Sequence, residues 1–327
     1  MKVSEAKKVL IIRLSSLGDV LLATPVVRSL KKNYPDLTID FFVKQNFEVA
    51  IRLNPNINSM IIYNDSPELA TQLKENNYDL VIDLHNNFRT KKIVKQLGLP
   101  YYKFIKPNLE KFLLVHTKIN LLKEKKPIPV RYAEVIPDFN LDDKGLELFI
   151  PDGIHSELEG LNNVVGFAPG AFHFTKRWLI EYYAELGKKL NEDGYTIAIL
   201  GGESDKTICM DLQKMIPNSL DLSNNNNLFQ TAAHIKNCEA LICNDSGLMH
   251  TASAIGTPVI AIFGSTVREF GFAPYGIKSI VVENSELKCR PCTHIGKSKC
   301  PKGHFKCMKE ITPDLLYEKF KKFLEDL

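Results

Sequence analysis

Two series of short apolar runs, each followed by an amphipathic stretch, run through this 327-residue chain. Such alternation is typical of α/β proteins, in which helices connect parallel strands and cover both faces of the sheet. In the first series the expected strands are 8–13, 37–43, 57–63 and 80–84, and the expected helix is 20–32. In the second they are strands 164–168, 196–200, 240–243 and 259–263, and helices 179–192, 206–215 and 247–255. The pattern predicts two doubly wound, Rossmann-like domains.

A polar segment, residues 152–163, separates the two series. The length is about twice that of a typical domain, so we expect domains at 1–155 and 156–327. Residues 100–150 are less regular and contain several prolines. An amphipathic helix is expected over 313–327, and we consider that it packs back on the amino-terminal domain.

The composition, 44% apolar and 24% charged, is that of a soluble globular protein. No apolar run reaches the roughly 18 residues that a membrane-spanning helix requires. The polar start and the short apolar run after it do not form a signal peptide. We therefore expect a cytoplasmic protein in which Cys209, Cys238 and Cys243 are buried thiols.

The first strand ends in a turn of small residues, Ser15 to Asp19, that opens a helix. Gly18 permits tight backbone geometry there. Asp19 has two interpretations: a helix N-cap, or a general base that takes a proton from an attacking hydroxyl. A helix start beside it would lower the pKa of its carboxyl, so we expect Asp19 to be ionised at pH 7. A dinucleotide-binding loop would require G-x-G-x-x-G, and this turn has one glycine, which argues against an oxidoreductase.

The second domain has two loops that suit a nucleotide. Pro169–Gly170 follows a strand, and Thr175–Lys176 opens a helix, so that backbone amides and the lysine charge can meet a diphosphate. Gly201, Gly202 and Glu203 end another strand, where an acid can accept hydrogen bonds from ribose hydroxyls. The alternatives are a basic surface loop and a plain glycine turn.

A longer signal follows the expected strand 240–243. Asp245 and Ser246 are expected to cap a helix of small residues, and their amides together with those of Gly247 and Leu248 form an anion-binding helix start. His250 lies on the first turn, where a histidine is often structural but here faces the same anion.

These segments together resemble glycosyltransferase family 9, the ADP-heptose:lipopolysaccharide heptosyltransferases, and most of all the heptosyltransferase II type. The resemblance covers nearly the whole chain and rests on five motifs in the family's order: Arg13–Asp19 with Thr24–Pro25, Asp83–Thr90, Pro169–Ala171 with Lys176–Trp178, Gly201–Glu203, and Asn244–His250. One departure is Leu179, where the family often has proline.

The resemblance implies a GT-B fold with an interdomain cleft and inverting, metal-independent transfer of heptose from ADP-heptose to the lipopolysaccharide inner core. By motif, Asp19 resembles the general base, Lys176 the diphosphate-binding lysine and Glu203 the ribose-binding acid. The remaining donor-binding residues are Gly18, Thr175, Asp245, Ser246, Gly247, Leu248 and His250. Alternatives are a GT-B transferase for another nucleotide-sugar or acceptor, and a non-catalytic nucleotide-sugar binding protein.

Residues 88–131 contain twelve lysines and arginines against two glutamates, with aromatic residues between them. Such a cluster suits an anionic glycolipid acceptor and the inner face of the inner membrane, where we expect the protein to bind peripherally as a monomer. The expected acceptor-binding residues are Arg89, Lys91, Lys92 and Arg131. The alternatives are a solvated loop and a nucleic-acid surface, for which no binding motif is present.

Four cysteines near the carboxyl end, Cys289, Cys292, Cys300 and Cys307, have the composition of a zinc site. Their spacing is not the paired C-x2-C of a common zinc ribbon. We expect free thiols or a facultative disulfide and no required metal, and keep a structural metal as the alternative.

Overall fold

The computed structural model describes residues 1–122, 124 and 126–327, and the chain divides into two compact units. Unit 1 comprises Met1–Pro107 and Pro127–Phe149, and unit 2 comprises Asn108–Lys126 and Ile150–Leu327. Among the described helices, none has the length and apolar character needed to cross a membrane.

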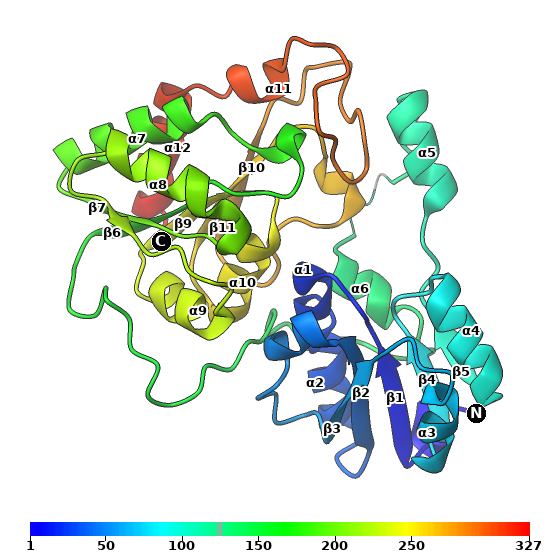
Figure 1. The fold of residues 1–327 in the computed structure, drawn as a ribbon. Helices are drawn as coiled ribbons and strands as arrows, with labels where there is room; N and C mark the ends of the chain where they lie inside the picture. Colours follow the sequence, from blue (N-terminus) through cyan, green and yellow to red (C-terminus); the bar gives the residue numbers. More distant parts are fainter. Residues whose placement is uncertain (123, 125) are drawn as a thin grey trace. The chain divides into compact units, whose positions relative to one another are not determined.

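Unit 1 is built on a five-stranded parallel sheet with the strand order β3-β2-β1-β4-β5 (Figure 1). The strands are β1 (Lys8–Ile12), β2 (Thr38–Lys44), β3 (Ser59–Tyr63), β4 (Leu80–Asp83) and β5 (Tyr101–Lys103). Helices α3 (Leu69–Glu75) and α4 (Phe88–Leu97) contact each other and share a core with alternate residues of the strands, among them Leu10, Ile12 and Val81. Helices α2 (Thr24–Asn33) and α6 (Ile128–Ala133) form a second contacting pair.

The helix expected over 20–32 is wrong as a single element. The structure has a short helix, α1 (Leu17–Leu21), and then α2, which begins at Thr24 with Pro25 in its first turn. Proline has no backbone N–H to donate to the preceding turn, so it starts a helix but does not continue one. The break places α1 directly after β1.

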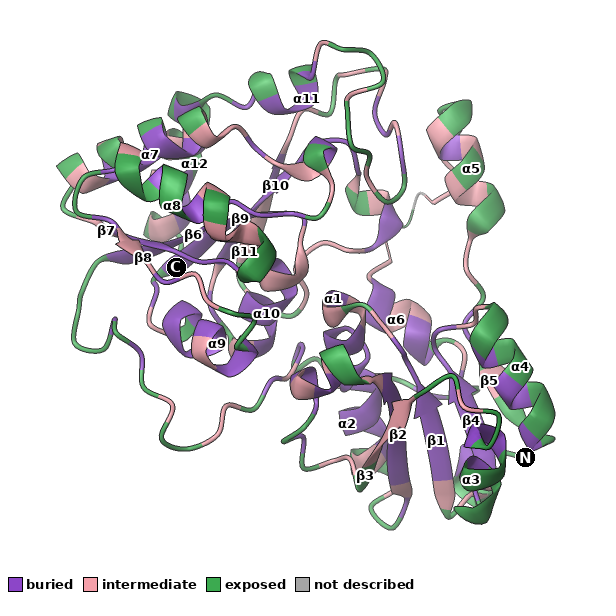
Figure 2. Ribbon diagram, viewed as in Figure 1, coloured by how far each residue is buried: buried purple, intermediate pink, exposed green. Residues whose placement is uncertain are grey.

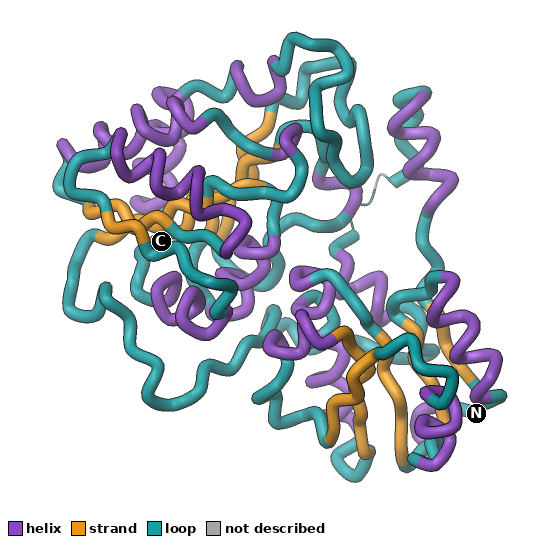
Figure 3. Tube along the Cα trace, in the orientation of Figure 1, coloured by secondary structure: helices purple, strands orange, loops and turns teal. Residues whose placement is uncertain are grey.

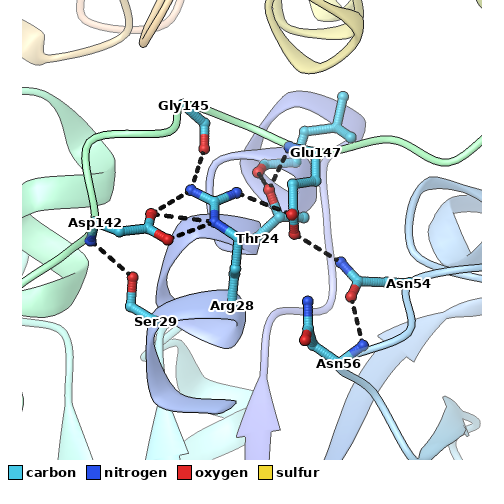
Figure 4. A network of polar contacts seen from close by, with 9 residues as sticks. Thr24, Arg28, Ser29, Asn54, Asn56, Asp142, Gly145 and Glu147 are labelled. Carbon is cyan, nitrogen blue, oxygen red and sulfur yellow. Dashed lines mark hydrogen bonds and ion pairs between the residues drawn. The ribbon is translucent and has the colours of Figure 1, made fainter. Parts of the chain in front are cut away.

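The last residues of unit 1 are attached to α2 by a buried arginine (Figure 4). Arg28 donates to both carboxylate oxygens of Asp142 and to the carbonyl of Gly145, and pairs with Glu147 at 3.1 Å. The Glu147 backbone N–H also donates to the Thr24 hydroxyl. This network holds the chain on unit 1 immediately before it continues into unit 2.

Unit 2 has a six-stranded parallel sheet with the order β11-β10-β9-β6-β7-β8. The strands are β6 (Val164–Ala168), β7 (Thr196–Ile199), β8 (Leu220–Asp221), β9 (Ala240–Asn244), β10 (Val259–Phe263) and β11 (Ser279–Glu283). Its helices are α5 (Asn108–His116), α7 (Ile180–Glu192), α8 (Lys206–Met215), α9 (Leu228–Lys236), α10 (Gly247–Ile255), α11 (Lys306–Lys309) and α12 (Pro313–Glu325). Two apolar clusters sandwich the sheet, so its central strands are buried on both faces (Figure 2).

The terminal helix α12 belongs to the core of unit 2. It contacts α7 and buries Leu316, Phe320 and Phe323 in the same apolar cluster as that helix. The expectation that this helix also packs back on the amino-terminal domain stays a prediction. Long loops connect β11 to α11 (Figure 3). The short 3-10 helices are Val3–Glu5, Gln45–Ala50, Phe174–Lys176, Glu203–Asp205 and Arg268–Phe270.

The predicted fold class, two doubly wound parallel sheets, is confirmed. In each sheet the strand order reverses at one point, between β1 and β4 in unit 1 and between β6 and β9 in unit 2. Ligands of open α/β sheets bind beyond the carboxyl ends of the strands at such a point. The loops that follow β1, β6 and β9 hold Asp19, Lys176 and Asp245, whereas Glu203 follows β7.

Candidate functional site

Asp19 is held at the start of α1, beside the end of β1. One carboxylate oxygen is 2.5 Å from a guanidinium nitrogen of Arg13. The other accepts hydrogen bonds from the Ser16 hydroxyl (2.8 Å) and the Ser16 backbone N–H (3.1 Å). Asp19 is the third residue of the helix rather than its N-cap, a position that Ser16 occupies, and its side chain remains 18% exposed.

These contacts set the charge of Asp19. Burial by itself would raise the pKa of its carboxyl, but the charge of Arg13 and the hydrogen bonds from Ser16 outweigh burial, so the pKa lies below its usual value. The sequence predicted this direction but attributed it to the helix start. Arg13 is itself buried and oriented by a hydrogen bond to the carbonyl of Leu84 at the end of β4.

Two further groups interact electrostatically with this carboxylate, His85 and Lys106, and neither was among the predicted site residues. His85 follows β4 and is 9% exposed; burial and the charges of Arg13 and Lys106 lower its pKa to about 3, so it is neutral. Burial also lowers the pKa of Lys106, which interacts electrostatically with Arg13 and Asp19. His85 belongs to the quoted motif Asp83–Thr90, whereas no local pattern identified Lys106.

The predicted acceptor residues of unit 1 differ in their surroundings. Arg89, Lys91 and Lys92 are exposed on α4, whose start is capped by Asn87. Arg131, on α6, is partly buried, which lowers its pKa. The basic stretch 88–131 is divided between the two units at residues 107/108 and 126/127, and Lys123 and Lys125 lie outside the described residues.

In unit 2, Lys176 and Asp245 form an ion pair. The Lys176 ammonium is 2.7 Å from a carboxylate oxygen of Asp245, and the Thr266 hydroxyl donates to the same oxygen at 2.7 Å. Lys176 follows β6 and Asp245 follows β9, so the pair joins the two loops of the switch point.

The first turn of α10 is open to an anion. Ser246 occupies the N-cap position, but its side chain makes no cap hydrogen bond, and the Asp245 carboxylate is engaged by Lys176 and Thr266 instead. The expectation that these two side chains cap the helix is therefore wrong. Because the N-cap side chain makes no hydrogen bond to this turn, the backbone N–H groups of Gly247 and Leu248 can bind a ligand. His250 is buried on the same turn.

Buried polar contacts fix the loop that carries Lys176. Thr175 accepts hydrogen bonds on its side chain from the Ser265 hydroxyl (3.0 Å) and the Lys297 backbone N–H (2.8 Å). The Asn244 side chain bridges to the Trp178 backbone N–H and the Pro169 carbonyl. Thr175 thus orients the loop from inside the fold, and Gly18 is likewise buried within its helix.

Glu203 lies after β7, exposed, with its carboxylate held by the Asn226 amide at 3.3 Å. Close packing explains the small residues in the neighbouring loops. A Cβ atom at Gly170 would lie 2.3 Å from the Asp205 carboxylate, and one at Gly202 would lie 2.4 Å from the Asn226 side chain. A larger residue at either position would displace a polar side chain of this surface.

The four carboxyl-terminal cysteines are free thiols. The Cys289 sulfur lies 3.8 Å from the His304 ring, and burial raises the pKa of Cys307 to about 12. Among the described residues, no three histidine, cysteine or acidic side chains are grouped as metal ligands.

Unit 1 thus presents an ionised carboxylate, and unit 2 presents an uncapped helix start with a lysine. A base for an attacking hydroxyl and a cationic site for a phosphate leaving group are what transfer from an activated sugar requires. These features define the class of nucleotide-sugar-dependent glycosyltransferases. The chain belongs to one family of this class, glycosyltransferase family 9 (heptosyltransferase), whose model matches residues 67–302.

The chain is similar to lipooligosaccharide heptosyltransferase 2 of Haemophilus influenzae, with 27% identity over 97% of this chain and 99% of the relative. It resembles the crystal structure of a family 9 glycosyltransferase from Veillonella parvula, with a TM-score of 0.80, 21% identity and coverage of 100% and 99%. It also resembles ADP-heptose LPS heptosyltransferase II of E. coli, with a TM-score of 0.74, 24% identity and coverage of 98% and 99%. The predicted family and fold are confirmed, and the protein is heptosyltransferase II-like.

Proposed function

We propose that the protein transfers heptose from ADP-heptose to the inner core of lipopolysaccharide, with inversion at the anomeric carbon and without a required metal. The observation that carries the proposal is the ionised Asp19, held by Arg13 and Ser16 at the strand switch point of unit 1. The names of the similar heptosyltransferases support the donor and the acceptor class.

The reaction is a single displacement. An acceptor hydroxyl attacks the anomeric carbon, its proton passes to the Asp19 carboxylate, and the bond from the sugar to the β-phosphate oxygen breaks. A carboxylate with a lowered pKa is a weak base, suited to a proton that leaves late in the displacement. The mechanism requires the donor, held by the predicted donor domain 156–327, to reach Asp19 in the predicted acceptor domain 1–155.

The leaving ADP is stabilised by unit 2. The backbone N–H groups of Gly247 and Leu248 and the start of the helix dipole meet the diphosphate, and Ser246 and His250 border it. The Lys176 side chain leaves Asp245 and pairs with the phosphate oxygens instead. Thr175 keeps the backbone of this loop in place. Glu203 accepts hydrogen bonds from the ribose hydroxyls.

We place the anionic acceptor at the basic residues of unit 1. Arg89, Lys91 and Lys92 offer exposed charges on α4, and Arg131 lies on α6 next to Tyr132, whose ring is 5.6 Å from the Arg13 guanidinium carbon. Ammonium and guanidinium groups suit phosphate and carboxylate substituents.

The enzyme works at a membrane surface, which we infer from α5 and the segment after it. Of the seventeen large apolar side chains that are exposed among the described residues, seven fall within residues 88–121. Leu109 and Phe112 lie on one face of α5, 66% and 57% exposed, and Ile119 and Leu121 follow. Apolar side chains among lysines suit an anionic bilayer. Mutation of both Leu109 and Phe112 to serine should reduce co-sedimentation with anionic vesicles, whereas Met210→Ser should not.

A transfer assay tests the proposed function. The purified chain, ADP-heptose and a heptose-deficient inner-core acceptor are expected to release ADP in step with the glycosylated product. Binding of ADP-heptose without ADP release would favour a non-catalytic binding protein. Faster turnover of a UDP- or GDP-sugar would favour a transferase for another donor.

A further inference from the structure

We propose that a pocket between α4 and β5 binds a phosphate or carboxylate group carried by the acceptor saccharide. The α4–β5 pocket has a volume of 420 Å³ and is lined by Asp83, Asn86, Lys91, Val94, Lys95, Tyr101 and Lys103. All of these residues belong to unit 1. The inference rests on the proposed function, because it takes the acceptor to be an anionic saccharide.

The lining follows from the geometry of the two elements. Lys91, Val94 and Lys95 are spaced at i, i+3 and i+4, so they lie on one face of α4. Tyr101 and Lys103 are two residues apart and therefore point to the same side of β5. Tyr102 points to the other side, where its hydroxyl donates to the Met1 carbonyl. The neighbouring Lys92 and Arg89 are on α4 but do not line the pocket.

The charges of the pocket are mostly unpaired. Within the described part of the chain, none of its three lysines forms an ion pair, and the Lys103 ammonium lies 5.8 Å from the centre of the Tyr101 ring. The one acid, Asp83, is engaged: a single oxygen accepts the backbone N–H groups of His85 (2.9 Å) and Asn86 (2.8 Å). Burial raises the pKa of Asp83, so its negative charge is disfavoured.

This combination selects the class of ligand. Three ammonium groups around one cavity provide several strong donors to an oxyanion. The volume is within the range of small-molecule pockets and leaves room for a sugar ring beside the anion. Val94 and the Tyr101 ring supply apolar surface for such a ring. A lone divalent cation is disfavoured by the three lysines.

The pocket lies on the same sheet edge as Asp19. β4 pairs with β1, and β5 pairs with β4, with Asp83 opposite both Ile12 and Lys103. At about 4.8 Å per strand spacing, β5 is about 10 Å from β1. Lys106 interacts electrostatically with Asp19 and also with Asp83 and Lys91. One oligosaccharide can therefore place a hydroxyl at Asp19 and an oxyanion in the pocket.

Chemical labelling of lysines on the full-length protein tests the binding site directly. Glucose 6-phosphate is expected to protect Lys91, Lys95 and Lys103 from acetylation, and glucose is not. Lys74, exposed on α3 of the same unit, is the matched control and should be labelled equally in all samples. Absence of protection, or equal protection of Lys74, would overturn the proposal. Protection by phosphatidylglycerol vesicles alone would overturn it in favour of lipid headgroup binding.

Kinetics test whether the bound anion belongs to the acceptor. Lys95→Ala and Lys103→Ala should each raise the acceptor KM about tenfold, since one charge-assisted hydrogen bond is lost. The kcat and the affinity for ADP should not change, Lys74→Ala should resemble the wild type, and Lys95→Arg should restore most of the loss. An unchanged KM in both alanine variants would contradict the inference. If no acceptor is turned over, the proposed function fails, and the labelling result still decides whether the pocket binds oxyanions.

Discussion

The two switch points of this molecule have the same topology and opposite charge. In unit 1 the loop after β1 presents a carboxylate whose hydrogen bonds are satisfied within the chain, by Arg13 and Ser16. In unit 2 the loop after β9 presents backbone N–H groups that no side chain caps, next to Lys176. The first arrangement keeps a carboxylate ionised, and the second leaves a helix start to which an anion can bind.

The difference arises from the short loops and not from the sheets. Both sheets are parallel, and their central strands are apolar and buried under the helices on both faces. In unit 1 the residue at the third helical position, Asp19, accepts the hydrogen bonds of its own N-cap. In unit 2 the acid that precedes the helix, Asp245, is drawn to a lysine on the neighbouring loop. The sheet thus determines where the site lies, and a few loop residues determine the chemistry of the site.

The largest effect should come from Asp19→Asn, which removes the base and keeps the shape. Transfer should fall by about 10³-fold, within the range expected for loss of a general base. Affinity for ADP should be unchanged, since the proposed donor-binding residues all belong to unit 2 except Gly18, which this variant keeps. Single-turnover transfer and calorimetric titration with ADP measure the two quantities. A loss of ADP binding would show that Asp19 has only a structural role.

Lys176→Gln should have the second largest effect and should differ from Asp19→Asn in its effect on ADP binding. The rate should fall about 10²-fold, as for loss of one group that stabilises a developing negative charge. Affinity for ADP should fall as well, and the pH dependence of the remaining activity should be that of the wild type. Equal affinity for ADP in Lys176→Gln and the wild type would remove Lys176 from the donor site.

Arg28→Met should lower the stability of unit 1 and leave that of unit 2 unchanged. Arg28 and Asp142 are buried, with side chains 10% and 8% exposed, so removal of the cation should cost unit 1 about 3 kcal/mol. Denaturant unfolding should then show an earlier transition for unit 1, while ADP still binds to unit 2. An unchanged unfolding curve would mean that the network in Figure 4 contributes little.

The smallest effect should come from Ser16→Ala, visible only in acid. The lowered pKa of Asp19 keeps it ionised below the usual range near 4, so wild-type activity should stay level as the pH falls from 7 to about 5. The associated stability is present above the unfolded pKa and is lost as the pH falls through the folded pKa. Loss of one hydrogen bond should move the acid limb of kcat/KM up by about one pH unit. An unmoved limb would show that the Ser16 hydroxyl does not contribute to the lowered pKa of Asp19.

The sheets and the site loops could be predicted because their signals are local. Apolar runs between glycine and polar loops identified the central strands, and parallel topology brought the loops after them to one edge. The single helix over 20–32 was wrong because its apolar periodicity continues across Pro25. Residues 100–150 were read as irregular because β5 is three residues long and prolines obscure α6.

Contacts between distant residues could not be predicted. The capping role given to Asp245 followed from local preference, whereas the structure pairs it with Lys176 and Thr266 on other loops. The low pKa of Asp19 was expected from a helix start, but it comes from the charge of Arg13 and the hydrogen bonds from Ser16. The α4–β5 pocket forms where one face of a helix meets one face of a strand, and the sequence does not show that these faces meet. Lys95 and Lys103 were therefore recognised only as part of a basic stretch.

The stereochemistry of one turnover shows whether transfer is a single displacement. A limiting amount of ADP-heptose is converted with excess acceptor, and the anomeric configuration of the product is determined by NMR. A single displacement should release one ADP per heptosyl product and give the configuration opposite to that of the donor. Retention of configuration would require a second displacement and would rule out the proposed mechanism.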